Sequence, residues 1–487
     1  MNNELHLLYS TDQVRELDRI AIEERHISGL TLMKRAAEAC VMALMETWPE
    51  PGPIAVLCGS GNNAGDGFII AGLLRAKGLD VRLCLIGSEP SPDCDAARAL
   101  EYAKESEVSL VSLDESLHGV DLIVDALLGT GASGEVRPHF AEAIQAANQA
   151  SAQILSVDLP SGLSADTGSG LGECIRADLT VTFIGRKLGL YTCDGPEYAG
   201  EIRFADLDVP VDIFEQVPAV AGCLNYSAEA RLLKPRHKNA HKRSHGHVLV
   251  IGGDNGMAGA AIMAAEAALY TGAGLVSVAT RNAAAIVARR PEVMALEVET
   301  AEDLTALVAR ATVVVIGPGL GLSDWSRDMW TEALTGSQPL VVDADGLNLL
   351  ATAPLKRDDW VLTPHPGEAA RLLEGAPVQP DRPAAVRLLV EKYGGTVLLK
   401  GAGTLIGCEE SLTLCPYGNP GMSVAGMGDV LSGVIASLIA QGYPLPQAAR
   451  LGAVVHSLAA DYLADRQGER GLLAAEMLPE IRRLVNP

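Results

Sequence analysis

Polar residues able to bind a ligand follow an apolar run near the start of the chain. The run at 53–58 is predicted to be a strand, and the sequence CGSGNNAGDGFIIAGLLRAKG continues from Cys58 into a predicted helix. Its glycines would let backbone amides approach an anion at the helix N-terminus, at the strand edge where open α/β sheets bind ligands. A tight strand-to-helix turn explains the glycines equally well. The specific signal is therefore the pair Asn62 and Asn63 together with Asp66.

Two later strand ends carry further oxygen ligands. Asp125 ends an apolar run and leads into LLGTGASGE, while Asp158 ends another run and is followed by Ser161. Either aspartate alone is equally well a helix cap or a satisfied buried carboxylate. Three polar loops on one edge, without His or Cys, favour a hard alkali or alkaline-earth cation over zinc.

The C-terminal half contains a glycine-rich turn that feeds an apolar helix, in the sequence YGNPGMSVAGMGDVLSGVIASLIAQG from Tyr417. The amides of Gly426, Met427 and Gly428 would lie at the positive helix N-terminus and form a cradle for a phosphate or an oxyanion. Asp429 follows them as either an N-terminal cap or a general base, and residue chemistry alone leaves both interpretations open.

Three other segments carry polar groups at predicted strand ends. Lys400 begins KGAGT, a flexible loop suited to the phosphates of a nucleotide, and His365 lies between two prolines in TPHPGEAARL. In VVDADGLNLL, Asp343 or Asp345 is a ligand of magnesium or of a substrate amide, or else stabilises a turn. The run HKNAHKRSHGH is predicted to be solvated, because its Lys and Arg residues would repel a metal cation.

Short apolar strands alternate with helical patterns, which is typical of βαβ units and a parallel sheet. Neither half repeats the motifs of the other, so we predict two unrelated α/β domains, at 1–222 and 223–487. His456 lies on an apolar helix face and is predicted to belong to the core. After an amphipathic pattern at 10–48, the predicted strands are 53–58, 80–87, 121–129, 152–160 and 179–185, then 247–253, 275–280, 312–319, 339–346, 360–367 and 395–401.

Composition excludes several classes of protein. The 487 residues exceed what one hydrophobic core organises, and a net charge of −23 disfavours a nucleic-acid partner. The nine cysteines include no C-x-x-C pair, so we expect reduced thiols. The first residues do not resemble a signal peptide, and no apolar stretch approaches the ~18 residues of a membrane span. We therefore predict a cytoplasmic protein with no membrane or nucleic-acid partner.

Three motifs, G-x-G-N-N-x-G-D-G, D-x-x-x-G-T-G and D-x-P-S-G, occur in this order over residues 10–215, with Ala64 where glycine is commoner. Together they resemble the NAD(P)H-hydrate epimerase domain. The resemblance implies a Rossmann-like three-layer α/β domain, with K⁺ held by Asn63, Asp125 and Ser161. It also implies that Asp158 touches the substrate ring, where we expect an acid/base role. The implied contacts with the hydrated dinucleotide are Asn62, Asn63, Ala64, Gly65, Asp66, Gly129, Thr130, Gly131, Ala132, Ser133, Gly134, Glu135 and Asp158.

The spacing N-x-x-x-x-x-x-G-x-G-D, with HPGE, GPGLG and GGDNGMAG, resembles the NAD(P)H-hydrate dehydratase domain over residues 225–485. This resemblance implies a ribokinase-like three-layer α/β domain in which Asp429 is the catalytic base. It further implies Mg²⁺ and ADP as a co-substrate. The implied substrate contacts are Ala260, Gly321, His365 and Asp429, and the implied nucleotide contacts are Lys400, Gly401, Ala402, Gly403, Thr404 and Gly428.

The two halves together resemble the bifunctional NAD(P)H-hydrate repair enzymes, from about residue 10 to residue 485. Such an enzyme interconverts the R and S hydrates of NADH and NADPH and dehydrates the S form at the expense of ADP, which implies NADHX, NADPHX and ADP as partners. We expect a homo-oligomer. A vitamin-precursor or sugar kinase is the rival enzyme, which the HPGE loop and the fused first domain disfavour. An RNA or protein interaction module is the rival of another class, which the clustered oxygen ligands disfavour.

Overall fold

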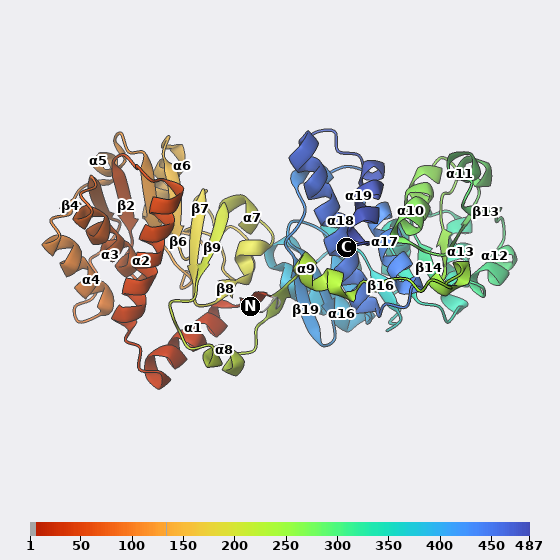
Figure 1. The fold of residues 1–487 in the computed structure, drawn as a ribbon, viewed down its shortest axis with the longest axis horizontal. Helices are drawn as coiled ribbons and strands as arrows, with labels where there is room; N and C mark the ends of the chain where they lie inside the picture. Colours follow the sequence, from red (N-terminus) through yellow and green to blue (C-terminus); the bar gives the residue numbers. More distant parts are fainter. Residues whose placement is uncertain (1–5, 133) are drawn as a thin grey trace. The chain divides into compact units, whose positions relative to one another are not determined.

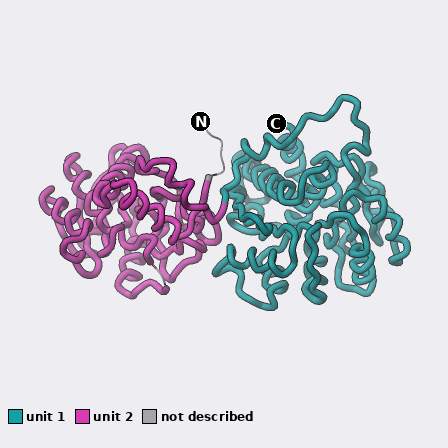
Figure 2. Tube along the Cα trace, turned by 90° about the horizontal axis from the view of Figure 1, so that it is seen from below, with its two compact units in different colours: residues 1–6, 222–487 teal, residues 7–221 magenta. Residues whose placement is uncertain are grey.

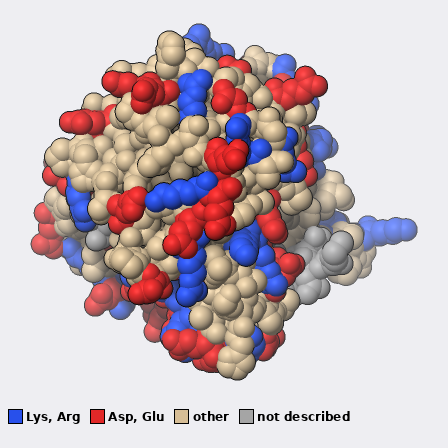
Figure 3. All heavy atoms as spheres, turned by 90° about the vertical axis from the view of Figure 1, so that its left-hand side faces the viewer, with Lys and Arg blue, Asp and Glu red and all other residues tan. Residues whose placement is uncertain are grey.

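The computed structural model describes residues 6–132 and 134–487, and it divides into two compact units, residues 7–221 and residues 222–487 (Figure 2). Among the described residues, no helix combines the length and the apolar character needed to cross a bilayer. On the face drawn in Figure 3, acidic and basic side chains are interspersed. All nine cysteines are free thiols.

The unit of residues 7–221 is built on a seven-stranded parallel sheet in the order β4-β3-β2-β5-β6-β7-β9 (Figure 1). Alternate residues of each strand face opposite layers, as the strand period of two requires. Val56 packs with helices α2, α3 and α4, whereas its neighbour Leu57 packs with α6. The strands are β2 (Ile54–Cys58), β3 (Val81–Leu85), β4 (Ser109–Leu110), β5 (Leu122–Ala126), β6 (Gln153–Val157), β7 (Leu179–Phe183) and β9 (Glu201–Ala205).

Helices on both faces make this unit a three-layer sandwich. The predicted amphipathic pattern at 10–48 forms two α-helices, because a π-helical turn at Ile20–Glu24 and a new N-cap at Ser28 interrupt it. Outside the seven-stranded sheet, β1 (His6–Tyr9) pairs in parallel with β8 (Arg186–Lys187). The helices are α1 (Thr11–Arg19), α2 (Gly29–Thr47), α3 (Asn62–Ala76), α4 (Asp95–Glu105), α5 (Leu113–Leu117), α6 (Pro138–Gln149), α7 (Gly195–Tyr198) and α8 (Asp212–Gln216).

In the unit of residues 222–487 the strand order is β13-β12-β11-β14-β15-β16-β17-β18-β19-β10. Strands β11 to β17 pair in parallel, but β18 and β19 continue the sheet antiparallel, which the strand pattern did not predict. The bounds are β10 (Ala221–Cys223), β11 (His247–Ile251), β12 (Leu275–Thr280), β13 (Met294–Glu297), β14 (Val313–Ile316), β15 (Leu340–Val342), β16 (Trp360–Leu362), β17 (Thr396–Leu399), β18 (Thr404–Cys408) and β19 (Ser411–Cys415).

Helices α10, α17, α18 and α19 form the main core with one face of this sheet. Val248 and Val250 point into that core, while Leu249 and Ile251 are fully buried on the other face. His456 is 4% exposed and belongs to the interior, as the sequence predicts. The helices are α9 (Tyr226–Glu229), α10 (Ala258–Thr271), α11 (Ala283–Arg289), α12 (Ala301–Val308), α13 (Asp324–Thr335), α14 (Ala344–Thr352), α15 (Pro366–Leu372), α16 (Arg382–Tyr393), α17 (Met427–Ala440), α18 (Leu445–Gln467) and α19 (Leu478–Leu484).

Candidate functional site

A cavity of about 740 Å³ opens at the carboxyl edge of the sheet in the first unit, and we call it the N-terminal cavity. Because β2, β5 and β6 are parallel, the loops that follow them meet at this edge. Ala64 is fully buried behind its wall, and Ser133 lies outside the described residues. The predicted residues that line the cavity are Asn62, Asn63, Asp66, Gly129, Thr130, Gly131, Ala132, Gly134, Glu135 and Asp158.

Helix α3 begins at this cavity with Asn62 and Asn63 in its first turn. Gly65 packs closely against Met33, since a Cβ at position 65 would lie 2.5 Å from the Met33 Cε. Gly129 lies against Asn63, with a Cβ built on it only 3.1 Å from the Asn63 Cβ. The first turn of the helix and the loop after β5 are therefore in direct contact.

Asp125 and Ser161 form a buried polar centre, and both are fully inaccessible to solvent. The Ser161 hydroxyl lies 2.6 Å from Asp125 Oδ1, and the Ser161 N–H donates to Asp125 Oδ2 at 2.9 Å. Ser156 donates to the same Oδ2 at 2.8 Å. Burial raises the pKa of Asp125, and these hydrogen bonds oppose the rise. Within the part of the chain that the structure describes, no basic side chain forms an ion pair with Asp125.

The donor set around Asp125 fits a hard cation. The carboxylate, the Ser161 hydroxyl and the Leu128 carbonyl, 3.1 Å from that hydroxyl, are all oxygen ligands. The amide nitrogen of Asn63 is buried without a hydrogen-bond partner among the described residues. A monovalent cation bound here would neutralise a buried carboxylate that now has only neutral donors.

Asp158 lies directly after β6 and is held from one side by Lys187 of β8. The Lys187 ammonium donates to Asp158 Oδ1, and the Phe183 N–H donates to the same oxygen at 3.2 Å. The Asp158 side chain is 13% exposed and that of Lys187 only 1%. Sequence reasoning missed Lys187, although a lysine between the apolar positions Ile184 and Leu188 was the available signal.

Two of the other carboxyl groups that line the N-terminal cavity, Asp66 and Asp18, have raised pKa values. Burial raises the pKa of Asp66 well above its usual value, and the charges of Asp158 and Asp18 add to the rise. Burial also raises the pKa of Asp18 to about 6, against the charge of Lys187. Asp18 was not predicted as a site residue. It lies on the stripe of Val14, Leu17 and Ala21, and an acid on an apolar stripe was the signal.

The second candidate site lies at the carboxyl edge of the other sheet, and we call it the C-terminal site. Its residues follow five parallel strands, β11, β14, β15, β16 and β17. These are Ala260, Gly321, Asp343, His365 and Lys400, respectively. Such an edge is where ligands bind in open α/β sheets.

Helix α17 supplies the N-terminus that the sequence predicts for this site, beginning at Met427. Gly426 is its N-cap with φ of 94°, and a Cβ there would lie 2.5 Å from the sulfur of Met263. Asp429 lies in the first turn, although its side chain does not cap the helix. Burial, with the negative charge of Asp343 nearby, raises the pKa of Asp429 to about 7. A carboxyl group with such a pKa is suited to general base catalysis near neutral pH.

Lys400 and Asp343 form a buried ion pair beside Gly428. Lys400 Nζ lies 2.8 Å from Asp343 Oδ1, and the Ser432 hydroxyl donates to Oδ2 at 2.8 Å. Burial opposes the charge on Asp343, but the charge of Lys400 together with hydrogen bonds from Lys400, Ser432 and Thr363 outweighs it and lowers the pKa of the carboxyl group. A Cβ on Gly428 would lie 3.1 Å from Lys400 Nζ, so glycine allows helix α17 to approach this pair. Of the two aspartates considered from the sequence, Asp343 is therefore the one bound to Lys400.

His365 caps helix α15 instead of projecting freely. Its Nδ1 accepts hydrogen bonds from the N–H groups of Gly367 at 3.0 Å and Glu368 at 3.4 Å, and its own N–H donates to Glu368 Oε2 at 2.8 Å. Burial and the charge of Lys400 lower the pKa of His365. A neutral imidazole with Nδ1 occupied has Nε2 as its remaining polar atom, and half of the side chain is exposed.

The loop Gly401 to Thr404 is the tight connection between β17 and β18. Gly401 and Gly403 have φ of 140° and 61°, and the Thr404 hydroxyl donates to the Gly401 carbonyl at 3.0 Å. Glycine is favoured at both positions because their φ values are positive. Gly401 and Ala402 are exposed, so their backbone is accessible to a nucleotide.

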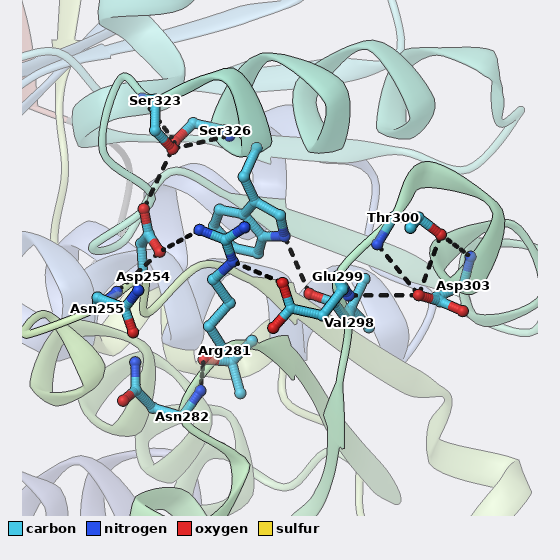
Figure 4. Close-up of polar contacts among 12 residues, drawn as sticks. Asp254, Asn255, Arg281, Asn282, Val298, Glu299, Thr300, Asp303, Ser323 and Ser326 are labelled. Atoms are coloured by element: carbon cyan, nitrogen blue, oxygen red, sulfur yellow. Dashed lines mark hydrogen bonds and ion pairs between the residues drawn. The ribbon is translucent and has the colours of Figure 1, made fainter.

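Ala260 lies in the first turn of helix α10, and the loop before that helix is hydrogen-bonded to the loop of Gly321, since Asp254 N–H donates to the Gly319 carbonyl at 2.8 Å. Figure 4 shows Arg281 between Asp254 and Glu299, with Ser323 bound to Asp254. The Arg281 guanidinium also lies 5.1 Å from the ring centre of Trp325. Sequence reasoning missed this network, whose members come from four separate loops.

Comparison with known proteins finds a separate family match for each unit. The family model described as YjeF-related protein N-terminus matches residues 29–189, and the model described as NAD(P)H-hydrate dehydratase matches residues 248–483. A solved ribokinase-like superfamily protein from Enterococcus faecalis is 30% identical, with a TM-score of 0.52, and the match covers 54% of this chain and 95% of that one.

Two curated relatives match along their length. The bifunctional NAD(P)H-hydrate repair enzyme of Coxiella burnetii is 48% identical over 99% of this chain and 100% of its own. The enzyme of the same name from Escherichia coli is 42% identical over 99% of this chain and 94% of its own. With two family models in the expected order and full-length relatives, the chain belongs to the family of bifunctional NAD(P)H-hydrate repair enzymes.

Proposed function

We propose that this protein repairs hydrated NADH and NADPH in two steps. The N-terminal cavity interconverts the R and S hydrates, and the C-terminal site dehydrates the S hydrate with ADP, releasing AMP and phosphate. Asp429 carries the proposal, because a buried carboxyl group with a pKa of about 7 lies at the amide-rich start of helix α17. The family membership of the chain supplies the substrate class.

In the epimerase step, Asn63, Asp125 and Ser161 would hold K⁺. The ion would supply positive charge beneath the loops that bind the dinucleotide, and it would compensate the buried Asp125 carboxylate. Asp158 borders the cavity above this centre and takes the acid/base role at the hydrated carbon. The residues after β2 and β5 hold the rest of the dinucleotide through backbone amides.

In the dehydratase step, Asp429 removes the proton of the ring hydroxyl as its oxygen attacks the terminal phosphate of ADP. The amides of Met427 and Gly428 stabilise the charge that develops on the transferred group. The phosphorylated oxygen then leaves as phosphate, which is a better leaving group than hydroxide. Lys400 neutralises charge at the same place, while the backbone of the Gly401 to Thr404 loop contacts the nucleotide.

Carboxylates around Lys400 fit Mg²⁺, which proteins hold through one or two carboxylates and the phosphates of a substrate. Glu368 Oε2 lies 3.9 Å from Lys400 Nζ, and its pKa is raised by burial. Glu368 would hold Mg²⁺ through Oε1, because Lys400 and Ser432 occupy both oxygens of Asp343 and the His365 N–H occupies Glu368 Oε2. The ion would add positive charge along the phosphates. We keep the predicted homo-oligomer and cytoplasmic location as part of this proposal.

The test is incubation of the purified protein with mixed R and S hydrates, with and without ADP and K⁺. We expect interconversion of the hydrates without ADP, and recovery of the absorbance of the reduced ring only when nucleotide is added. ATP in place of ADP measures nucleotide preference. An unchanged mixture in the presence of both ADP and K⁺ would contradict the proposal.

A further inference from the structure

Lys187 is a buried lysine in the wall of the N-terminal cavity. Its ammonium donates to Asp158 Oδ1, to the Thr182 hydroxyl at 3.1 Å and to the Phe183 carbonyl at 2.9 Å. An ammonium group has three N–H donors, so these contacts use all of them. Because Lys is almost never fully buried without a partner, the ion pair with Asp158 is what keeps this residue in the wall.

The two carboxylate oxygens of Asp158 differ in their hydrogen-bond partners. Oδ1 accepts hydrogen bonds from Lys187, from the Phe183 N–H at 3.2 Å and from the Thr182 hydroxyl at 3.4 Å. Oδ2 accepts no hydrogen bond from any residue in the described ranges. One oxygen is therefore anchored, while the other remains available to a molecule in the cavity that Asp158 lines.

The backbone on both sides of the pair is strained. Asp158 has φ of 70° and Ile184, three residues before Lys187, has φ of 59°. A β-branched residue with positive φ is rare, and such conformations persist where the surrounding structure holds a functional group in place. The two strained residues lie in the connections that bring Asp158 and Lys187 together.

Five carboxyl groups line the cavity, those of Asp18, Asp66, Asp95, Glu135 and Asp158, and Lys187 pairs directly only with Asp158. Burial raises the pKa of Asp66 well above its usual value and that of Asp18 to about 6, and the charge of Asp158 adds to both shifts. The Cys40 thiol also lies near, and burial raises its pKa far enough to keep it neutral. The buried Asp66 and the Asp158 that is paired with Lys187 thus lie in very different environments. Two carboxyl groups in such different environments are suited to act as base and acid.

We propose that Lys187 is a positioning residue of the epimerase site, which holds Asp158 in place as the proton acceptor while Asp66 is the proton donor. This inference rests on the proposed epimerase function. Asp66 protonates the ring hydroxyl, the carbon–oxygen bond breaks to release water, and the ring nitrogen supplies the electron pair for a carbon–nitrogen double bond. Water then adds to the opposite face and gives a proton to Asp158. Exchange of one proton with solvent at each carboxyl group restores the starting state.

The first experiment compares Lys187→Met with wild type in the absence of ADP, with R and S hydrates separated by chromatography. We expect kcat to fall about 100-fold while KM stays within a few fold of the wild-type value, because the other residues that line the cavity are unchanged. Lys104→Met is the matched control, because Lys104 pairs with Glu89 on the surface at 3.1 Å. Activity within tenfold of wild type, or a loss that appears in KM instead of kcat, overturns the inference.

A double variant separates this role from a purely structural one. Lys187→Met leaves a buried carboxylate without its cation, which destabilises the unit, whereas Lys187→Met with Asp158→Asn removes both charges. We expect the double variant to unfold at higher urea concentration than Lys187→Met and to be no less active. Additive losses of kcat would overturn the inference, because residues that act through one another do not contribute additively.

Asp66→Asn tests the proton donor. In a plot of kcat/KM against pH, this variant should lose the fall on the alkaline side together with most of the turnover. An alkaline limb that stays in place overturns the assignment. A wild-type protein that leaves the hydrates unchanged would refute the proposed function itself. A wild type that epimerises, with variants that behave like it, refutes only the roles of Lys187 and Asp66.

Discussion

Asp429 offers the sharpest test of the dehydratase mechanism, because its titration should be visible in the rate. Burial and the charge of Asp343 raise the pKa of this carboxyl group to about 7. A base must be ionised to accept a proton, so the active fraction grows as pH rises through this value. From pH 6 to pH 8 the ionised fraction increases from about a tenth to about nine tenths, and kcat/KM should rise about tenfold.

Substitutions make this prediction specific to Asp429. Asp429→Asn should lower the rate of ADP-dependent dehydration by ~10² to 10⁴ while epimerisation continues in the other unit. Asp343→Asn should move the limb to lower pH, because it removes a like charge and releases Lys400 toward Asp429. Asp465→Asn, on the exposed side of helix α18, is the matched control.

The assay follows the absorbance of the reduced ring at saturating ADP, with the spontaneous rate at each pH subtracted. Epimerisation, measured in the same preparation, reports whether the protein remains intact. A kcat/KM that stays constant between pH 6 and pH 8 would refute the reasoning. So would an Asp429→Asn variant that dehydrates faster than about a tenth of the wild-type rate, since a residue with a merely local structural role would behave in this way.

Three other predictions concern buried polar groups. Asp125→Ala should weaken the dependence of epimerisation on K⁺, because it removes the one charged ligand proposed; a potassium titration equal to that of wild type would exclude the site. Asp158→Asn should keep substrate affinity and lose turnover, which binding measurements and single-turnover epimerisation can separate; saturating turnover within about tenfold of wild type would remove Asp158 from the catalytic residues. Burial lowers the pKa of His456 to about 4, so the unfolded chain takes up its proton first as pH falls. The unit should therefore lose about 3 kcal/mol of unfolding free energy between pH 6.5 and pH 4, measured by urea unfolding. His456→Gln should reduce this slope, and an unchanged slope would refute the assignment.

The sequence predicts those parts of the site that follow a simple rule of position. Asp125 and Asp158 end strands of one parallel sheet, so their proximity follows from the strand pattern alone. The start of helix α17 and the loop after β17 are predictable for the same reason.

Side-chain partners in three dimensions are not predictable in this way. Lys400 was expected to contact phosphates, but its Nζ also binds Asp343, which is 57 residues away in the sequence. Lys187 and Asp18 lie outside the main sheet, in β8 and in α1, and no periodic pattern relates them to Asp158. Their roles depend on burial and on charges contributed by distant elements, which become apparent only in the folded chain.

The parallel pair of β1 and β8 also has a consequence for the order of folding. Tyr9 lies opposite Lys187, so the first described strand pairs with one synthesised near the end of its unit. Contacts between residues so distant in sequence require closure of a long loop and therefore form late. During synthesis, Asp18, Asp66 and Asp158 leave the ribosome before the lysine that pairs with Asp158. Until Lys187 is added, solvent must hydrate these carboxylates, and the cavity wall can close only when this unit is almost complete.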